Sequence, residues 1–201
     1  MIHSLLKFIS LTHRFSQIKR RIYATGEDRW ENNSEHSFQL ALCAWYIIEA
    51  EKLPLRSGLA IQYALAHDLV ELHAGDTFAF DTDTQKHITK KERELHAASM
   101  LAAEWPDFGG LHQIIQNYEN LSDEESMFVY ALDKLLPAAN NYLNAGRAWK
   151  YHKLSLEQVR QLKEKQIPVS PFVWRSWQEL YTLLQKDEET LFGEPHPPPH
   201  A

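Results

Sequence analysis

Apolar residues recur at helical spacing along most of this chain, and this pattern constrains the fold more than any other feature. Between Leu5 and Arg21, leucine, isoleucine and phenylalanine residues fall every three or four positions and describe one buried face. No segment shows convincing strand alternation of apolar and polar residues. We therefore expect an all-α fold built as a helical bundle.

Two capping patterns predict where helices begin. Asn32, with Glu35 three residues later, has the form of a capping box, so a second helix is expected to start there, with His36 in its first turn. Ser122 and Glu125 repeat the pattern ahead of a long apolar-faced helix. Pro137 is expected to kink that helix.

A third helix is expected after Pro54. It carries the dipeptide His67-Asp68 and ends before Gly75, since glycine readily takes the left-handed backbone that closes a helix. Residues 76–89 read as an exposed loop that could lie over a site. Further elements are expected at Lys90–Glu104, Leu111–Tyr118, Ser155–Lys165 and Pro171–Gln185.

Length and charge bound the class of protein. With 201 residues and no evident linker, we expect one domain over residues 1–193 and a disordered tail at 194–201. A formal net charge of −6 argues against a nucleic-acid partner. Cys43 is the only cysteine, which excludes an intrachain disulfide and favours a reducing compartment. No stretch is long enough to span a bilayer, so we expect a cytoplasmic protein without a membrane partner.

Two histidines and two aspartates occur in the order His36, His67-Asp68, Asp133. Imidazole nitrogens and carboxylate oxygens together suit a first-row divalent cation and leave positions open for water or a phosphate oxygen. Asp133 falls among apolar neighbours, where an unpaired carboxylate would cost several kcal/mol. Each residue alone could be an ordinary packed polar group, but the ordered set favours the metal site of a hydrolase.

Two more acidic residues follow the dipeptide His67-Asp68. Glu71 is four residues after His67 and three after Asp68, which places it on the same helical stripe, and Asp76 comes just past Gly75. One such group could take a proton from an attacking water while the other orients the water or protonates the leaving oxygen. A surface glutamate and a turn-closing aspartate are the alternative explanation.

The quoted residues and their neighbours resemble the HD superfamily of metal-dependent phosphohydrolases. The segments Glu-Asn-Asn-Ser-Glu-His-Ser at 31–37 and His-Asp-Leu-Val-Glu-Leu-His-Ala-Gly-Asp at 67–76 look like signatures of the branch that contains the bacterial 5′-deoxynucleotidases. The resemblance covers about residues 21–150, and segment 141–150 also looks like uncharacterised members of this branch. It implies a single all-helical HD domain.

The resemblance also implies a set of site residues. Glu71 and Asp76 would be the acidic catalytic residues, and Arg21, fifteen residues before His36, would contact phosphate. One divalent ion is implied, which could be manganese, cobalt, magnesium, zinc or iron. Its expected ligands are His36, His67, Asp68 and Asp133.

The implied substrate is a small phosphorylated molecule, namely a nucleoside 5′-monophosphate. Lys134 is a second candidate for phosphate contact and could equally be a solvated helix residue. In the deoxynucleotidases a tryptophan tied to deoxyribose recognition follows the phosphate-binding arginine, whereas this chain has Ile22 there. The preference between ribose and deoxyribose therefore stays open. Relatives often form homodimers, and a homodimer is open here as well.

Three alternatives remain. A dinuclear HD enzyme, including the oxygenase types, would need extra ligands from the intervening histidines. An HD hydrolase could instead act on a nucleoside triphosphate, a cyclic nucleotide or a non-nucleotide phosphate. The third alternative is a non-catalytic helical binding protein with a structural metal. The intervening histidines are His73, His87, His96 and His112.

Overall fold

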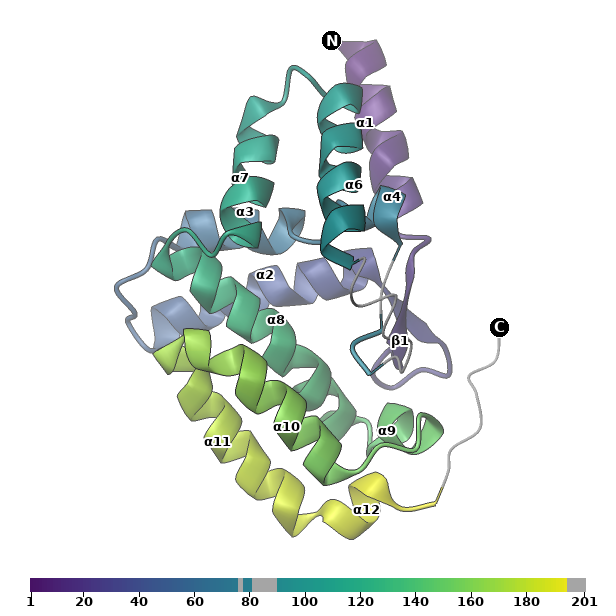
Figure 1. Cartoon of the computed structure of the whole chain (residues 1–201), viewed down its shortest axis with the longest axis vertical. Coiled ribbons are helices and arrows are strands. Elements are labelled where there is room, and N and C mark those ends of the chain that lie inside the picture. Colours follow the sequence, from purple (N-terminus) through teal and green to yellow (C-terminus); the bar gives the residue numbers. More distant parts are fainter. Residues whose placement is uncertain (76–77, 81–89, 195–201) are drawn as a thin grey trace.

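Helices make up most of the computed structural model, which describes residues 1–75, 78–80 and 90–194 (Figure 1). The all-α fold class is confirmed. The described helices are α1 (Ile2–Phe15), α2 (Asn33–Ala50), α3 (Ser57–Ala66), α4 (Glu71–Ala74), α6 (Lys90–Glu104), α7 (Gly109–Glu119), α8 (Glu124–Leu143), α9 (Arg147–Tyr151), α10 (Leu156–Gln166), the 3₁₀ turn η1 (Ile167–Val169), α11 (Pro171–Lys186) and α12 (Glu188–Phe192). Two short strands, β1 (Lys19–Tyr23) and β2 (Trp30–Asn32), complete the list.

The larger hydrophobic core surrounds α8. Helices α2, α3 and α11 and the turn η1 pack on it, and α10 runs beside it in Figure 1. Its apolar residues recur at helical spacing, so one wide face of α8 is buried. Fully buried side chains of this core include Leu40, Tyr63, Phe128, Leu132 and Trp177.

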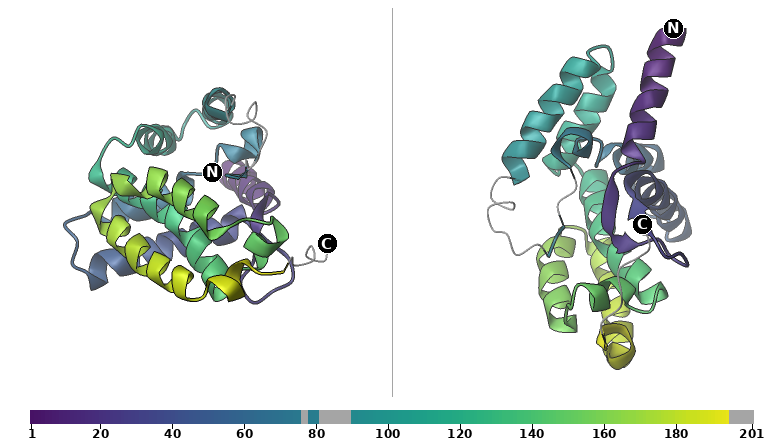
Figure 2. Two further views of the ribbon diagram at one scale, coloured as in Figure 1. Left: turned by 60° about the horizontal axis from the view of Figure 1, so that its bottom comes forward. Right: turned by 90° about the vertical axis from the view of Figure 1, so that its right-hand side faces the viewer.

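A second, smaller core lies between α1, α6 and α7, which project together from one end of the molecule (Figure 2). Leu11 and Leu101 are fully buried in it. Ala64 belongs to the larger core, while Ala66 and Val70 belong to the smaller one. The segment that carries His67 and Asp68 therefore lies where the two cores meet.

The first helix is shorter than the spacing of its apolar residues indicates. It ends at Phe15, and residues 19–23 form a strand that pairs antiparallel with Trp30–Asn32 through an irregular register. Gly26, at φ +81°, takes the left-handed backbone in the connecting turn. The expectation of a helix to Arg21 and of no strand is wrong here, because Arg20, Ile22 and their neighbours alternate in exposure along only five residues.

The third helix is interrupted where continuity was predicted. It ends at Ala66, the chain turns through residues 67–70, and a new short helix starts at Glu71. The backbone N–H of Glu71 donates to the carbonyl of Asp68 at 2.9 Å, which closes this turn. The continuous apolar run masks the break, because the turn is buried on both sides by the two cores.

One predicted cap is confirmed and the other is displaced. Asn32 and Glu35 form the expected capping box of α2. The N-cap of α8 is Asp123, which pairs with Ser126, and not Ser122 with Glu125. Glu125 is unavailable for capping because its carboxylate accepts two hydrogen bonds from the Arg56 guanidinium, both at 2.9 Å.

The remaining elements agree with the predicted ones to within two residues, and Pro137 lies inside α8. The short helices α9 and α12 were not predicted. Most of the expected loop at 76–89, and all of the tail beyond Glu194, lie outside the described residues. Within the described chain, no helix combines the length and apolar character needed to cross a membrane. A cytoplasmic location stays a prediction.

The turn between α8 and α9 passes very close to α12. Gly146 sits there at φ +71°, and a Cβ at this position would lie 2.8 Å from Leu191 Cα and overlap the Leu191 carbonyl. Gly26 has a similar φ of +81°, but a Cβ there would meet no atom within 4 Å. A side chain at either position would strain the backbone, but only one at Gly146 would also overlap neighbouring atoms.

We predict that Gly146→Ala lowers the free energy of unfolding by about 3 kcal/mol, because positive-φ strain and overpacking against α12 add together. The matched variant Gly26→Ala should lose only about 1 kcal/mol, from strain alone. Urea unfolding followed by tryptophan fluorescence measures both. Equal losses in the two variants would contradict the close approach of α12 to this turn.

Candidate active site

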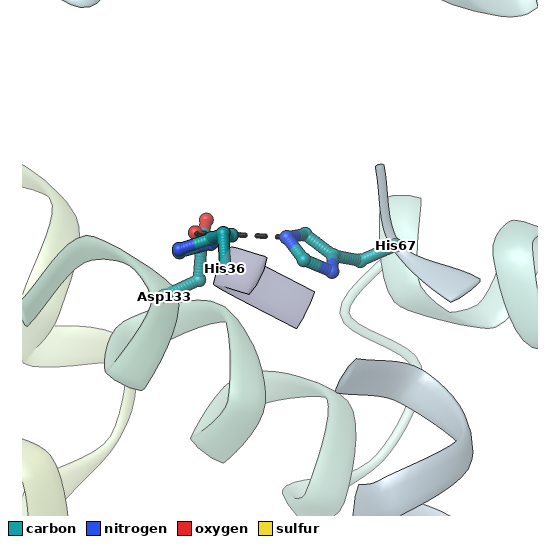
Figure 3. Close-up of side chains that lie close together, drawn as sticks. All are labelled: His36, His67 and Asp133. Atoms are coloured by element: carbon teal, nitrogen blue, oxygen red, sulfur yellow. Dashed lines mark hydrogen bonds and ion pairs between the residues drawn. The ribbon is translucent and has the colours of Figure 1, made fainter. Parts of the chain in front are cut away.

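Three elements bring two histidines and one aspartate together in the interior. His36 lies in the first turn of α2, His67 caps the C-terminus of α3, and Asp133 lies in the middle of α8. One possible ligand atom from each lies within 4.8 Å of the others. Figure 3 shows the His67 ring facing the His36 and Asp133 side chains. His36 Nε2 donates to Asp133 Oδ1 at 2.8 Å, and His67 Nε2 is 3.6 Å from the same oxygen.

Local structure orients both imidazoles. His67 Nδ1 donates to the carbonyl of Ala64 at 2.9 Å, so Nε2 is the nitrogen that faces the cluster. The Nδ1 atom of His36 is 3.8 Å from Glu31 Oε2. Glu31, in β2, was not predicted to have a role in the site, yet its side chain is buried close to His36.

Unsatisfied buried atoms indicate that the cluster is suited to a cation. His67 Nε2, His36 Nδ1 and Glu31 Oε2 are buried without a hydrogen-bond partner in the described chain. Buried polar atoms without partners are uncommon unless a water, an ion or a ligand satisfies them. Two imidazoles and a carboxylate are donors that fit a divalent first-row metal. If Nε2 of His36 served as a ligand, Glu31 could accept the proton on Nδ1.

Asp68 lies at the edge of the three-residue cluster. Its Oδ2 is 3.0 Å from His67 Nε2 and accepts a hydrogen bond from Arg20 Nη1 at 2.7 Å. Arg20 Nε is 3.5 Å from Glu31 Oε2, and its Nη2 is 4.0 Å from Asp133 Oδ1. The guanidinium thus contacts three carboxylates, and Asp68 is adjacent to the cluster while paired with a cation.

Arg20, and not the expected Arg21, reaches this cluster. The Arg21 side chain is exposed at the border of the cavity, and its carbonyl accepts from His152 Nε2 at 3.0 Å. Successive side chains of a strand point to opposite faces, so neighbouring arginines cannot both face the same cluster. The alternation along β1 is the signal that could have identified Arg20, but the helical interpretation of this segment hid it.

Burial and charge shift the pKa values of the cluster in opposite directions. Burial, together with the charge of Arg20, lowers the pKa of His36 to about 4. Burial also acts to lower the pKa of His67, but the carboxylates of Asp68 and Asp133 outweigh it and raise this pKa to about 10. His36 is therefore neutral, and a metal at its Nε2 would require only that the ring proton move to Nδ1, whereas a metal at His67 would displace a proton.

Lys134 shares the Asp133 carboxylate. Its Nζ donates to Asp133 Oδ2 at 2.6 Å and lies 5.0 Å from the centre of the Tyr130 ring. Burial acts to raise the pKa of Asp133, but the charge of Lys134 and the hydrogen bond from His36 hold it well below its usual range. Both Asp133 oxygens are thus engaged, one by His36 and one by Lys134.

Glu71 is buried beside the cluster at the start of α4. Asn33 Nδ2 donates to Glu71 Oε2 at 2.6 Å, which fixes the orientation of the carboxylate. Burial is the main cause that raises the pKa of Glu31, in β2, to about 7. Asp76, the second expected acid, lies outside the described residues.

A cavity of about 540 Å³ opens beside the cluster. This volume is in the range of small-molecule sites. It is bordered by the candidate ligands His67, Asp68 and Asp133 and by Glu71. The wall also carries several aromatic and apolar residues, the acidic residues Glu94 and Glu119, and the basic residues Arg20, Arg21, Lys134 and Lys163.

The histidines considered for a second metal do not join the cluster in the described structure. His73 Nε2 is 3.5 Å from Glu104 Oε2, and His112 Nε2 donates to the carbonyl of Trp105 at 2.7 Å. His96 is exposed on α6, and His87 lies outside the described residues. The described part of the chain therefore offers one candidate metal cluster.

Known proteins share both the sequence pattern and the fold. A mouse protein named 5′-deoxynucleotidase HDDC2 is 28% identical over 134 residues, which are 65% of this chain and 64% of the mouse protein. The chain thus spans slightly less than two thirds of that relative.

Two solved structures are similar to this chain over most of its length. A predicted metal-dependent phosphohydrolase from Magnetospirillum magnetotacticum matches with a TM-score of 0.80 and 28% identity over 96% of both chains. The PH0347 protein from Pyrococcus horikoshii shares the fold, with a TM-score of 0.60 and 21% identity over 91% of this chain and 99% of that one.

The match to a protein family covers most of the chain and includes the site. The family model of the HD domain matches residues 13–174, which include the hairpin and all three cluster residues. This chain therefore belongs to the HD-domain superfamily of metal-dependent phosphohydrolases.

Proposed function

We propose that this protein hydrolyses nucleoside 5′-monophosphates to a nucleoside and inorganic phosphate. The observation that carries the proposal is the buried cluster of His36, His67 and Asp133, because His67 and Asp133 border a cavity that also presents basic side chains. A nucleotide substrate is supported by the name of the mouse relative, a 5′-deoxynucleotidase. The cavity volume of about 540 Å³ suits a ligand of this size.

The metal ligands we propose are the three cluster residues together with Asp68, and they would hold one divalent ion. Manganese, cobalt, magnesium, zinc and iron all suit such nitrogen and oxygen donors. A bound metal supplies a Lewis acid and a source of activated water. The Ala64 carbonyl holds the His67 ring by a hydrogen bond, and Glu31 could accept the Nδ1 proton of His36 if a metal were bound at Nε2.

Glu71 is our candidate for the general base. It borders the cavity, and the hydrogen bond from Asn33 fixes the orientation of its carboxylate, which would accept the proton of an attacking water. Asp76 remains the alternative acid or base proposed from the sequence. Whichever group takes the water proton, the other can protonate the leaving 5′ oxygen of the nucleoside.

Arg20 is our leading candidate for holding the phosphate. Its guanidinium already lies among Asp68, Asp133 and Glu31, and a planar fork of donors suits the non-reacting oxygens of a phosphoryl group. Arg21 and Lys134, the residues proposed from the sequence, border the same cavity. Arg21 could contact the substrate from the exposed rim, and Lys134 from within.

Aromatic side chains offer a place for the nucleoside. The rings of Phe78 and His152 lie 4.3 Å apart at an interplanar angle of 33°, and both residues border the cavity. Flat apolar faces of this kind stack well with a base. Ile22 also borders the cavity and packs beside Tyr23. A branched aliphatic side chain there offers no ring to the sugar, so the selectivity for deoxyribose depends on other groups.

Metal-dependent phosphate release tests the proposal directly. Metal-stripped protein, re-supplied singly with manganese, cobalt, magnesium or zinc, should release phosphate from nucleoside 5′-monophosphates. The panel should contain ribose and deoxyribose forms of each base. Protein that binds metal but releases no phosphate from any member would contradict the nucleotidase proposal and favour another phosphate ester or a binding role.

The variant Asp68→Ala should lose both metal and activity. We expect metal content to fall from about one ion per chain to near zero and turnover to fall on the order of a hundredfold or more, since a ligand is removed. Metal analysis and phosphate release give the two readouts, and circular dichroism monitors folding. Asp107→Ala, on an exposed loop, is the matched control. Activity retained by Asp68→Ala would refute this ligand assignment.

The variant Glu71→Gln should keep the metal and lose turnover. The amide can still accept the hydrogen bond from Asn33, but it cannot take a proton from water, so kcat should fall by roughly 10² to 10⁴. Metal content and KM should change little. Glu49→Gln, exposed on α2, serves as control. A normal kcat in Glu71→Gln would refute Glu71 as the general base and favour Asp76 instead.

A further inference from the structure

Lys163 occupies a position on α10 that normally holds an apolar residue. Leu156, Val159 and Lys163 are spaced by three and four residues and form the buried face of this helix. Only 5% of Lys163 is exposed, although lysine is almost never fully buried unless it is paired. A charged residue on the core face therefore needs an explanation.

This lysine has neither a hydrogen-bond partner nor an ion-pair partner among the described residues. Arg20 and Lys134, in contrast, pair with Asp68 and Asp133. Burial lowers the pKa of Lys163 to about 7. The charges of Lys134 and Arg20 act in the same direction, and the charge of Asp133 acts against them. Three cations thus lie within electrostatic reach of one another, and one of them lacks a partner.

The side chain borders the same cavity as the metal cluster. Leu162, Lys163 and Gln166 form the α10 part of the wall of the cavity that Arg20 and His67 also border. Gln166 lies three residues after the lysine, on the same side of the helix, and its Oε1 is buried without a hydrogen-bond partner in the described chain. Two polar groups of one wall are therefore unsatisfied next to a cavity that can hold a ligand.

We propose that Lys163 binds the phosphate group of the substrate, by donating hydrogen bonds to oxygens that do not take part in bond cleavage. A phosphate dianion is the ligand that would bring three cations together, because the anion offsets their mutual repulsion. The identity of the anion rests on the proposed function, whereas an anion-binding role for this lysine does not. Gln166 accepts a hydrogen bond from a hydroxyl of the ligand or from a bound water.

This role implies a conflict between stability and binding. An ammonium on an apolar helix face is unfavourable for folding while the cavity is without an anion. A methionine of similar length would pack against Leu156 and Val159 without that cost. The variant should thus be at least as stable as the parent and yet bind phosphate more weakly. A lysine with a purely structural role would give the opposite result for stability.

Titration calorimetry with inorganic phosphate, the product of the proposed reaction, tests the inference on the full chain loaded with magnesium. Lys163→Met should weaken phosphate binding about tenfold or more, as expected for the loss of a charge-assisted hydrogen bond. Its urea unfolding midpoint should be equal to or higher than that of the parent. Lys163→Arg should retain part of the affinity. Lys165→Met, exposed two residues further along α10, should change neither quantity.

Parent-like phosphate affinity in Lys163→Met, or a parent protein that binds no phosphate, would overturn the inference. A lower unfolding midpoint in Lys163→Met and Lys163→Arg alike would also overturn it, since the lysine would then stabilise the fold. Phosphate binding that depends on Lys163, in a protein that hydrolyses no nucleotide, would reject the proposed function but support this inference. Normal nucleotide turnover with unchanged phosphate affinity in Lys163→Met would reject only the inference.

Discussion

The buried hydrogen bond between His36 and Asp133 links α2 to α8 inside the larger core, and the arrangement of the site depends on it. Neither partner can be exchanged alone, because the other would be left desolvated and unsatisfied. This bond therefore fixes how the first turn of α2 lies against the middle of α8. His67 reaches the same point from the break after α3, where the larger core meets the smaller one.

The charge distribution explains how an acidic chain can offer a site to an anion. The net charge is −6, yet Arg20, Lys134 and Lys163 border one cavity. Two of these cations offset Asp68 and Asp133, so the carboxylates that suit a metal do not repel a phosphate as strongly as bare acids would. A metal in the cluster would add to this local positive field.

Much of this architecture could be predicted from the sequence, because helix periodicity and the order of chemically distinctive residues are local signals. The helix class, the cap at Asn32 and the residues that converge as His36, His67 and Asp133 are of this kind. Arg20 was missed because the alternation along the five-residue strand β1 is short, and the helical interpretation of this segment hid it. Lys163 was missed because its burial depends on how α10 packs, which no local pattern reveals.

A manganese soak of the crystallised protein, with anomalous diffraction measured near the manganese absorption edge, tests the metal site most directly. We predict a strong anomalous peak among His36 Nε2, His67 Nε2 and Asp133, with Asp68 turned toward it. A fully occupied peak elsewhere on the chain, or none at this cluster at saturating manganese, would contradict the assignment of the cluster as the metal site.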